Sequence, residues 1–189
     1  MLWIVGGPNG AGKSTVAVKH LDALIPVVSP DTIAAASSMT ALEAGKAAIR
    51  EQERLLAERA VFAIDTTFSG KRELDLLSRA KAAGYRVYLV FVGIDSPQDC
   101  LKRIEERVSN GGHDVAPEDV VRRYHRSMRN LALAAPVVDR LYLLDNALKA
   151  RRLVLLMDRG RTRFLARHPP EWAREALPEF VRQRVRLSR

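Results

Sequence analysis

Short apolar runs alternate with longer amphipathic segments through the first 150 residues of the chain. The apolar runs predict strands at residues 2–5, 26–28, 61–64, 86–92 and 141–144. The segments between them have helical spacing and predict helices at residues 13–21, 40–60, 71–83, 97–108 and 117–134. This alternation is typical of an α/β domain, in which helices flank both faces of a mainly parallel, here five-stranded, sheet.

Signals at the helix ends support these boundaries. Thr40, followed three residues later by Glu43, forms a capping-box pattern that predicts a helix start at Thr40. Ser96 is a favourable N-cap residue, and Pro97 fits the first position of a helix. Gly84 suits the left-handed conformation that often ends a helix. The local signals therefore agree with the hydrophobic pattern.

The pattern changes after residue 150. Two strand-like runs surround the turn signal Asp-Arg-Gly at 158–160, which predicts a β-hairpin over residues 152–165. A short helix is predicted at 171–177. We therefore expect a core at residues 1–150 and a basic C-terminal hairpin and helical extension at residues 151–189, packed on the same domain.

Composition limits the class of protein. With 189 residues, 47% of them hydrophobic and 28% charged, the chain is neither disordered nor membrane-spanning, and it can build one sizeable core. Its one cysteine, Cys100, excludes an intramolecular disulfide framework. The run that follows Met1 lacks the pattern of a secretory signal, so we expect a cytoplasmic protein.

The net charge of +9 is concentrated near the C-terminus, where residues 151–189 carry eleven Lys and Arg against four Asp and Glu. An arginine-rich segment of this kind either contacts nucleic-acid phosphates or forms a solvated surface. No nucleic-acid-reading motif accompanies it. The sequence therefore does not favour a nucleic-acid partner.

A glycine-rich motif at residues 7–14 carries the strongest functional signal. It fits G-x-x-x-x-G-K-[ST] at every position and lies between a predicted strand and a predicted helix, as a phosphate-binding loop does. Lys13 would reach the β- and γ-phosphates of ATP or GTP, and Ser14 would help hold Mg²⁺. The predicted nucleotide-binding residues are Gly7, Pro8, Asn9, Gly10, Ala11, Gly12, Lys13, Ser14 and Thr15.

Carboxylates follow the predicted parallel strands, so we expect them at the edge of the sheet that carries this loop. A kinase needs one carboxylate to accept the proton of the acceptor hydroxyl and another to hold Mg²⁺. Asp31 follows a stiff proline and is the candidate for the first role, while Asp65 is a metal candidate with Ser14. Asp95 and Asp145 are interpreted as turn or cap residues.

Polar and basic residues further along the chain complete the predicted site. Thr66 and Thr67 directly follow Asp65 and are candidate substrate contacts, and His113 in a glycine-rich loop is either a contact or a surface residue. Cations that close over the transferring phosphoryl group would form a lid, although the same residues also fit a solvated helix surface. The lid candidates are Arg103 and Arg107 on one predicted helix and Arg122, Arg123 and Arg126 on the next.

In this order, the motifs resemble those of the zeta toxin family of P-loop small-molecule kinases. The resemblance rests on residues 6–15, 29–34, 65–70, 107–115 and 145–146, together with 84–85 and 122–124. It implies ATP- or GTP-dependent phosphorylation of a hydroxyl on a sugar nucleotide such as UDP-N-acetylglucosamine. It also implies Asp31 as the base and Arg107, or else Arg103, as the arginine that stabilises transferring charge. An antitoxin partner is left open.

Two other functions fit the same motifs. The acceptor of a P-loop kinase could instead be a nucleoside, a polynucleotide end or another metabolite. The chain could also be a nucleotide-dependent ATPase switch that binds a protein or RNA partner. The sequence alone does not choose the acceptor or the preference between ATP and GTP.

Overall fold

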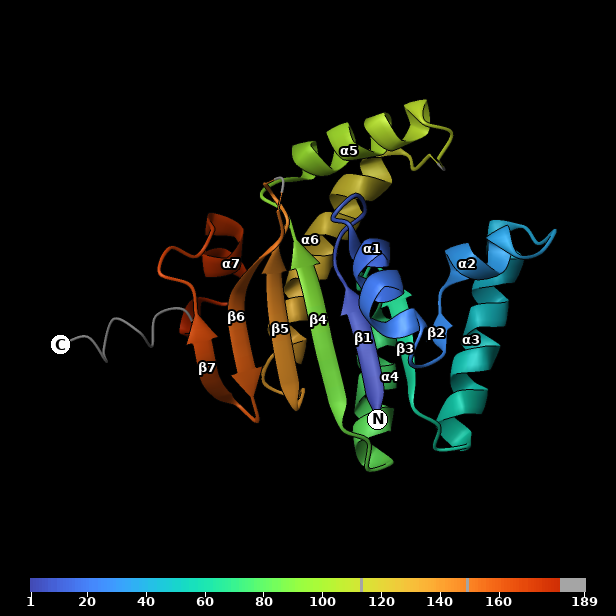
Figure 1. Ribbon diagram of the computed structural model, residues 1–189, viewed down its shortest axis with the longest axis horizontal. Coiled ribbons are helices and arrows are strands. Elements are labelled where there is room, and N and C mark those ends of the chain that lie inside the picture. Colours follow the sequence, from blue (N-terminus) through green and yellow to red (C-terminus); the bar gives the residue numbers. More distant parts are fainter. Residues whose placement is uncertain (113, 149, 181–189) are drawn as a thin grey trace.

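Seven strands form one sheet in the order β2-β3-β1-β4-β5-β6-β7, as Figure 1 shows for the computed structural model. The structure describes residues 1–112, 114–148 and 150–180. The strands are β1 (Leu2–Gly6), β2 (Val27–Val28), β3 (Phe62–Thr66), β4 (Val87–Gly93), β5 (Arg140–Asp145), β6 (Arg152–Asp158) and β7 (Arg161–Leu165).

The five predicted parallel strands are confirmed, and the predicted hairpin extends their sheet. β1 pairs in parallel with β3 and β4, and β4 pairs in parallel with β5. β6 and β7 add antiparallel strands at one edge, so the sheet has seven strands rather than five. The hairpin turn places Arg159 at φ 48° and Gly160 at φ 73°, the left-handed pair that a tight two-residue turn requires.

The helices agree with the sequence pattern except near the first two strands. They are α1 (Lys13–Ala17), α2 (Pro30–Ala35), α3 (Ala41–Ala57), α4 (Lys71–Ala82), α5 (Pro97–Ser109), α6 (Pro117–Ala134) and α7 (Glu171–Ala176). The helix predicted at 13–21 is α1 followed by the π-helical turn η1 (Val18–Asp22), and the six-residue α2 was not predicted. The capping box at Thr40 is confirmed by reciprocal bonds with Glu43.

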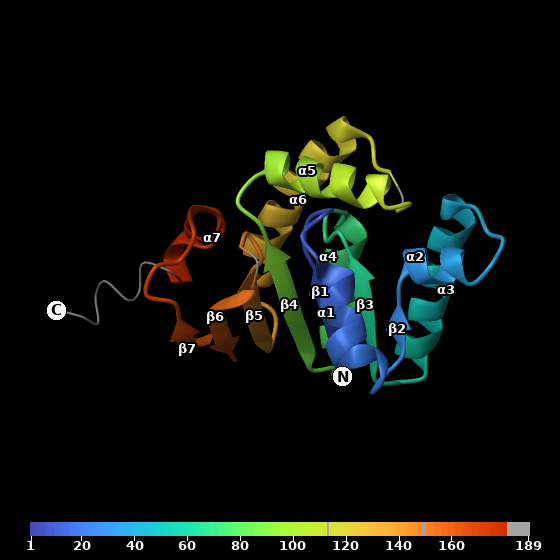
Figure 2. The same ribbon diagram turned by 45° about the horizontal axis from the view of Figure 1, so that its top comes forward.

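The helices cover the two faces of the sheet unequally. In Figures 1 and 2, α1 lies over β1 and β3 on one face, while α4 and α6 lie on the opposite face and α5 crosses above the carboxyl ends of the strands. After β5 the chain forms a hairpin, and no helix of the described residues lies over β4, β5 and β6 on the α1 side in either view. No helix among the described residues has the length and apolar content to cross a membrane.

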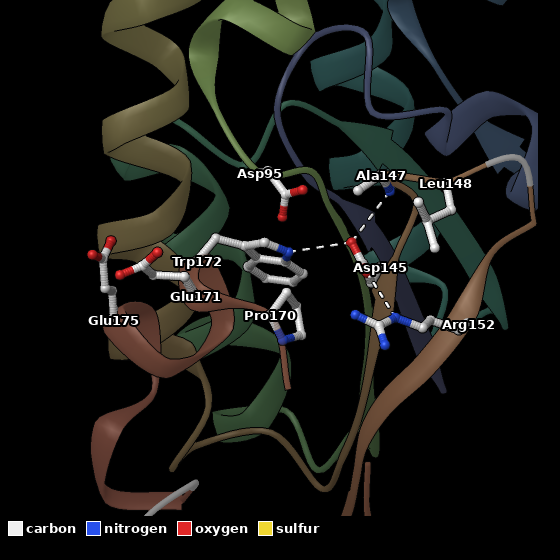
Figure 3. Close-up of a pocket in the computed structure, with 9 residues that line it drawn as sticks. All are labelled: Asp95, Asp145, Ala147, Leu148, Arg152, Pro170, Glu171, Trp172 and Glu175. Atoms are coloured by element: carbon white, nitrogen blue, oxygen red, sulfur yellow. Dashed lines mark hydrogen bonds and ion pairs between the residues drawn. The ribbon is translucent and has the colours of Figure 1, made fainter. Parts of the chain in front are cut away.

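Asp145 joins the end of β5 to the C-terminal elements (Figure 3). Its carboxylate, 2% exposed, accepts bonds from Arg152 Nε at 2.9 Å, Trp172 Nε1 at 3.3 Å and the backbone N–H of Ala147 at 3.2 Å. Hydrogen bonds of this kind offset the cost of burying a carboxylate. The turn or cap role predicted for Asp145 is therefore only part of its function, because it also anchors β6 and α7.

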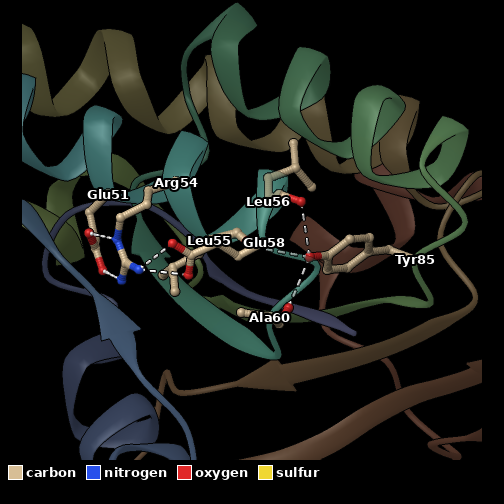
Figure 4. A network of polar contacts seen from close by, with 7 residues as sticks. All are labelled: Glu51, Arg54, Leu55, Leu56, Glu58, Ala60 and Tyr85. Carbon is tan, nitrogen blue, oxygen red and sulfur yellow. Dashed lines mark hydrogen bonds and ion pairs between the residues drawn. The ribbon is translucent and has the colours of Figure 1, made fainter.

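Tyr85, between α4 and β4, donates hydrogen bonds to carbonyl groups at the C-terminal end of α3 (Figure 4). Its hydroxyl lies 3.2 Å from the carbonyl oxygen of Leu55 and 3.0 Å from that of Ala60. Such a bond satisfies carbonyl groups that a helix end leaves without intrahelical partners. On the exposed side of the same helix, Arg54 bridges Glu51 and Glu58, an arrangement that adds little stability because water screens it.

Asp139 connects the start of β5 to α4 and β4. Both of its carboxylate oxygens accept bonds from Lys81 Nζ at 2.7 Å, and the backbone N–H of Val87 donates to Oδ2 at 2.8 Å. Burial alone would raise the pKa of Asp139, but the bonds from Lys81 and Val87 outweigh that effect and hold the pKa below its ordinary value. The ionised form therefore stabilises the fold.

Asp139→Asn is expected to lower the free energy of unfolding at pH 7 by about 2 kcal/mol, because it removes a charge-assisted contact from a partly buried place. A lowered pKa gives stability that is complete above the unfolded-state pKa, about 3.9, and that disappears as the pH falls through the folded-state value. Urea unfolding from pH 7 to pH 3 should therefore show the gap between variant and wild type closing below about pH 4. The exposed Asp75→Asn is the control, and an equal gap at both pH values would contradict this account.

Candidate phosphate-binding site

The loop after β1 takes a backbone path that only glycine permits. Gly7, Gly10 and Gly12 have φ values of 144°, 75° and 88°. A Cβ atom on Gly7 would lie 2.1 Å from the carbonyl oxygen of Val92, and one on Gly10 would lie 2.8 Å from that of Cys100. The loop therefore packs directly against the end of β4 and against α5, as the glycine motif predicts.

Asn146, just after β5, holds this loop from the side. Its Nδ2 donates to the carbonyl oxygen of Ala11 at 2.8 Å, and a Cβ on Gly12 would lie 2.7 Å from the same nitrogen. Arg103 Nη2 in turn donates to the carbonyl oxygen of Asn146 at 2.5 Å. The Arg103 guanidinium thus positions the segment after β5 against the loop.

Lys13, Ser14 and Asp65 meet at the start of α1. Lys13 Nζ donates to the carbonyl oxygen of Pro8 at 2.9 Å, and Ser14 Oγ donates to Asp65 Oδ2 at 2.7 Å. Asp65 is brought there by the parallel register of β1 and β3, which pairs it with Val5. The structure therefore joins the predicted phosphate lysine to both predicted metal ligands.

Burial perturbs both charged groups of this cluster in the direction that favours their neutral forms. It lowers the pKa of Lys13, against the opposing charges of Asp65 and Asp31, and it raises the pKa of Asp65 against the charge of Lys13 and the bond from Ser14. Burial also raises the pKa of the Cys100 thiol to about 12, so this cysteine is protonated at neutral pH. A site with perturbed charges beside a glycine loop is a candidate for binding or catalysis.

Asp31 and Arg107 lie around this cluster. Asp31 is exposed in the first turn of α2, and its charge raises the pKa of both Lys13 and Asp65. Arg107, on α5, acts in the opposite direction and lowers the pKa of Lys13. The two residues, 76 positions apart in the chain, thus both lie within electrostatic range of the lysine.

The threonines after Asp65 differ in their contacts. Thr66 Oγ1 donates to Glu73 Oε1 at 2.6 Å and accepts the backbone N–H of Phe68 at 3.1 Å. The Thr67 hydroxyl lies 2.8 Å from that of Ser69. Thr66 therefore holds its own loop, whereas Thr67 pairs only with a neighbouring hydroxyl among the contacts described.

Sequence reasoning missed two polar side chains that support this region. Asn130 Nδ2, buried on α6, donates to the carbonyl oxygens of Phe68 and Gly70 at 3.0 and 2.8 Å, and Glu73 receives the Thr66 hydroxyl. Asn130 precedes the buried Leu131 and lies four positions before the buried Ala134, so a polar residue on the core stripe of a helix was the available signal.

Asn9 carries an unsatisfied polar atom inside the loop. Its Oδ1 is buried and has no hydrogen-bond partner among the described residues. Buried polar atoms are nearly always paired, and an orphan in a phosphate-binding motif fits a place where a ligand or water supplies the partner. The loop thus fits the polar ligand that its motif predicts.

The remaining lid candidates lie on α6. Arg122 and Arg123 pair with Asp119 at 2.6 and 3.3 Å, and Arg126 is exposed. These contacts agree with a charged helix surface, and a role in a lid stays a prediction. His113, the other predicted contact, lies outside the described residues.

A cavity of about 490 Å³ opens beside the same sheet edge (Figure 3). Asp95 and Asp145 reach it from the ends of β4 and β5, and Trp172 and Glu175 reach it from α7. Ser96, rather than Asp95, caps α5, by accepting the backbone N–H of Asp99 at 3.1 Å. This confirms the N-cap predicted at Ser96, and the turn interpretation of Asp95 stays a prediction.

A family model described as an AAA domain, AAA_33, matches residues 2–131, more than two thirds of the chain. The chain belongs to this AAA domain family. The chain is also similar to an uncharacterized protein of Haemophilus influenzae, with 32% identity over 123 residues that make up 62% of this chain and 88% of that protein. The match spans the glycine loop and all the site residues up to α6.

This AAA domain protein is similar in fold to chains of solved structures. A chain of the AvrRxo1-ORF1:AvrRxo1-ORF2 complex superposes with a TM-score of 0.69 at 19% identity, over 95% of this chain and 64% of that one, so this chain spans less than two thirds of it. A chain of the PezAT toxin–antitoxin system of Streptococcus pneumoniae gives 0.62 at 16% identity, over 99% and 83%. These likenesses show the fold alone, an α/β domain with a mainly parallel sheet flanked by helices.

Gly7→Ala tests the close packing of the loop. The new Cβ would meet the Val92 carbonyl at 2.1 Å, with φ at 144°, and we expect a loss of about 3 kcal/mol in the free energy of unfolding, from overpacking and backbone strain together. Gly84→Ala is the matched control, because Gly84 has φ 81° and nothing within 4 Å of a Cβ, so only about 1 kcal/mol of backbone strain is expected. Equal losses in denaturant unfolding would contradict the packing argument.

Proposed function

We propose that this AAA domain protein is a kinase that transfers the γ-phosphoryl group of ATP or GTP to a hydroxyl group. The observation that carries the proposal is the cluster of Lys13, Ser14 and Asp65 at the end of the glycine loop, with Asp31 and Arg107 in electrostatic range. A complex of the AvrRxo1 proteins with ATP, similar to this chain in fold, adds support for a nucleoside triphosphate.

The loop residues bind the phosphates in this proposal. The glycines at 7, 10 and 12 let the backbone approach anionic oxygens closely, and the ammonium of Lys13 turns from the Pro8 carbonyl to the β- and γ-phosphates. A phosphate beside Lys13 also favours the charged ammonium that burial disfavours. The Asn146 bond to Ala11 holds the loop in its observed backbone conformation.

The residues at the centre of the site fit Mg²⁺. Ser14 and Asp65 offer a hydroxyl and a carboxylate oxygen 2.7 Å apart, which are the hard ligands this ion takes. The described residues contain no group of three or more His, Cys, Asp and Glu that could hold a metal, in keeping with an ion that is bound mainly through substrate phosphates. When bound, Mg²⁺ would neutralise charge on the β- and γ-phosphates.

Asp31 is the proposed general base. Its exposed carboxylate can accept the proton of the acceptor hydroxyl while that oxygen forms a bond to the γ-phosphorus and the bridging bond to the β-phosphate breaks, which releases the nucleoside diphosphate. Arg107 is the candidate for stabilising the transferring charge, because it acts on Lys13. Arg103 is assigned a positioning role, through its bond to Asn146.

The acceptor is proposed to be a sugar nucleotide of the UDP-N-acetylglucosamine class, on the strength of the resemblance to zeta toxins. The similarity in fold to a chain of a toxin–antitoxin system supports this choice, and an antitoxin partner and a cytoplasmic location stay predictions. Thr67 is the better candidate of the two threonines for an acceptor contact, because Thr66 is engaged by Glu73. The continuous sheet and the bond from Trp172 to Asp145 support the proposal that the hairpin and helical extension pack on the same domain as the core.

The reaction is tested with γ-labelled ATP or GTP, Mg²⁺ and a panel of sugar nucleotides, nucleosides, oligonucleotides and cell extract. Mass analysis of the labelled product identifies the acceptor. Label on a sugar nucleotide supports the proposal, and label on an oligonucleotide end or another metabolite keeps the kinase and replaces the acceptor. Label that appears only as free phosphate indicates an ATPase and contradicts the proposal.

Lys13→Ala is expected to weaken triphosphate binding and to lower phosphoryl transfer by at least about 100-fold, because the charge on the β- and γ-phosphates loses its cation. Binding is measured by calorimetry and transfer by the labelling assay. Lys102→Ala, an exposed lysine on α5, is the matched control and should retain both. Intact transfer in the Lys13 variant would remove the loop from the mechanism.

Asp31→Asn is expected to leave ATP binding nearly unchanged while phosphoryl transfer falls roughly 100-fold or more, as loss of a general base predicts. The exposed Asp22→Asn, just before β2, removes a carboxylate of the same length and serves as the control. Turnover that is unchanged in the Asp31 variant would exclude this residue as the base.

A further inference from the structure

Among residues 1–112, 114–148 and 150–180, no helix covers β4, β5 and β6 on one face of the sheet. The strand registers place Trp3, Tyr88, Tyr142, Leu156 and Phe164 on the same side of β1, β4, β5, β6 and β7, and we call these five residues the aromatic face. In Figures 1 and 2, α1 lies beside this surface and no helix crosses β4, β5 or β6 below α5. Parallel strands are ordinarily covered on both sides, so an exposed apolar face across β4 and β5 indicates a surface that contacts a partner or ligand.

The rings on this surface are arranged as a platform. Trp3 meets Tyr88 edge to face, with centroids 4.9 Å apart, and lies nearly parallel to Tyr142, with centroids 6.3 Å apart and 20° between the planes. Phe164, on the edge strand β7, is 43% exposed. With strands about 4.8 Å apart, the platform spans about 19 Å from β1 to β7. Trp3, Tyr88 and Tyr142 are each partly exposed, so their surfaces are available to a ligand.

Three arginines of β5 and β7 lie at one side of the aromatic face. The Arg140 guanidinium lies 5.3 Å from the Tyr88 ring centroid, and Arg161 stands opposite Asp158 in the hairpin register. Arg163, 55% exposed, reaches to 3.8 Å from Asp158, which also accepts Arg140. Asp158 thus contacts two of these three arginines, so the positive charge of the three side chains exceeds the negative charge of this aspartate.

Aromatic rings beside guanidinium groups favour one class of partner. Bases of a single strand stack on exposed rings regardless of sequence, and arginines beside the rings neutralise the phosphates. A second copy of the chain would instead bring a like positive charge against this surface, in a protein whose net charge is already +9. Charge complementarity thus favours an anionic, aromatic ligand.

We infer that the aromatic face binds single-stranded nucleic acid, with bases on Trp3, Tyr142 and Phe164 and phosphates on Arg161 and Arg163. This interpretation reverses the expectation drawn from the sequence, which lacked a recognised nucleic-acid-reading motif. The surface lies on the side of the sheet, whereas the proposed phosphoryl-transfer site lies at the carboxyl ends of the strands. The two sites are therefore separable by experiment.

Fluorescence anisotropy with labelled oligo-uridine, oligo-thymidine and a DNA duplex of the same length tests the inference. Both single strands should bind more tightly than the duplex, because only unpaired bases can stack on the rings. If the two phosphates assigned to Arg161 and Arg163 are neutralised, the slope of log affinity against log salt should be about −1.4. No binding at low salt, or preference for the duplex, would overturn the inference.

Substitutions on the surface locate the binding. Arg161→Gln with Arg163→Gln should lower affinity about tenfold and flatten the salt slope by about 1.4. Arg50→Gln with Arg174→Gln removes the same charge from the exposed sides of α3 and α7, and this control should change both values much less. An equal loss in the two double variants would mean attraction by overall charge, which contradicts a defined surface.

Tryptophan fluorescence measures the stacking of bases on the aromatic face. Single strands should quench tryptophan fluorescence in the wild type and much less in Trp3→Phe, since the other tryptophan, Trp172, is only 3% exposed. Phe164→Ser should weaken binding about tenfold, whereas Leu133→Ser, which alters an exposed apolar residue on α6, should not. Quenching that is equal in wild type and Trp3→Phe would overturn the stacking assignment.

Two further measurements separate this surface from the other candidate occupants. Saturating ATP with Mg²⁺, and the Lys13→Ala variant, should leave oligonucleotide binding unchanged, whereas binding through the phosphate loop would be lost in both cases. Light scattering should find the same oligomeric state in the wild type and in Phe164→Ser. A dimer that Phe164→Ser dissociates would assign the surface to a second copy and overturn the inference.

Discussion

The parallel pairing of β1 with β3 is the constraint on which the candidate site depends. It places Asp65 beside Val5, one residue before the point where the chain leaves the sheet for the glycine loop. Ser14 and Lys13, at the start of the helix that follows, then meet a carboxylate that lies 51 and 52 positions away in the chain. Since a slip by one residue would turn the Asp65 side chain to the opposite face, strand register and site chemistry are linked.

The charges at this point are held in an environment that does not favour them. Burial disfavours both the ammonium of Lys13 and the carboxylate of Asp65, and each partly compensates the other. A bound polyanion would stabilise the charged form of Lys13, and a bound cation would stabilise the charged form of Asp65, because each ligand brings opposite charge close to a buried group. The unpaired Asn9 oxygen is a second sign of a site that is not complete in the protein alone.

Much of the fold could be predicted from the sequence, because the glycine loop, the capping box at Thr40 and the turn at 158–160 each depend on local chemistry. The side chains that support the site could not be predicted in this way. Asn146, Asn130 and Glu73 act through partners 135, 62 and 7 positions away, and only the folded chain brings the first two pairs together. The short α2 has Ser29 and Pro30 at its start, but it buries no residue and makes no side-chain cap bond, so it has no apolar stripe that would predict a helix.

The C-terminal hairpin links the two surfaces of the protein. Its first strand supplies Arg152 to the buried Asp145, which fixes the end of β5 next to Asn146 and therefore next to the glycine loop. The same hairpin continues the sheet where a crossover helix would have covered β4 and β5, and it adds Arg161, Arg163 and Phe164 to the exposed rings. The hairpin after β5 thus supports the site at the strand ends. It also leaves the sheet face without a covering helix, because a hairpin widens a sheet without adding a layer to it.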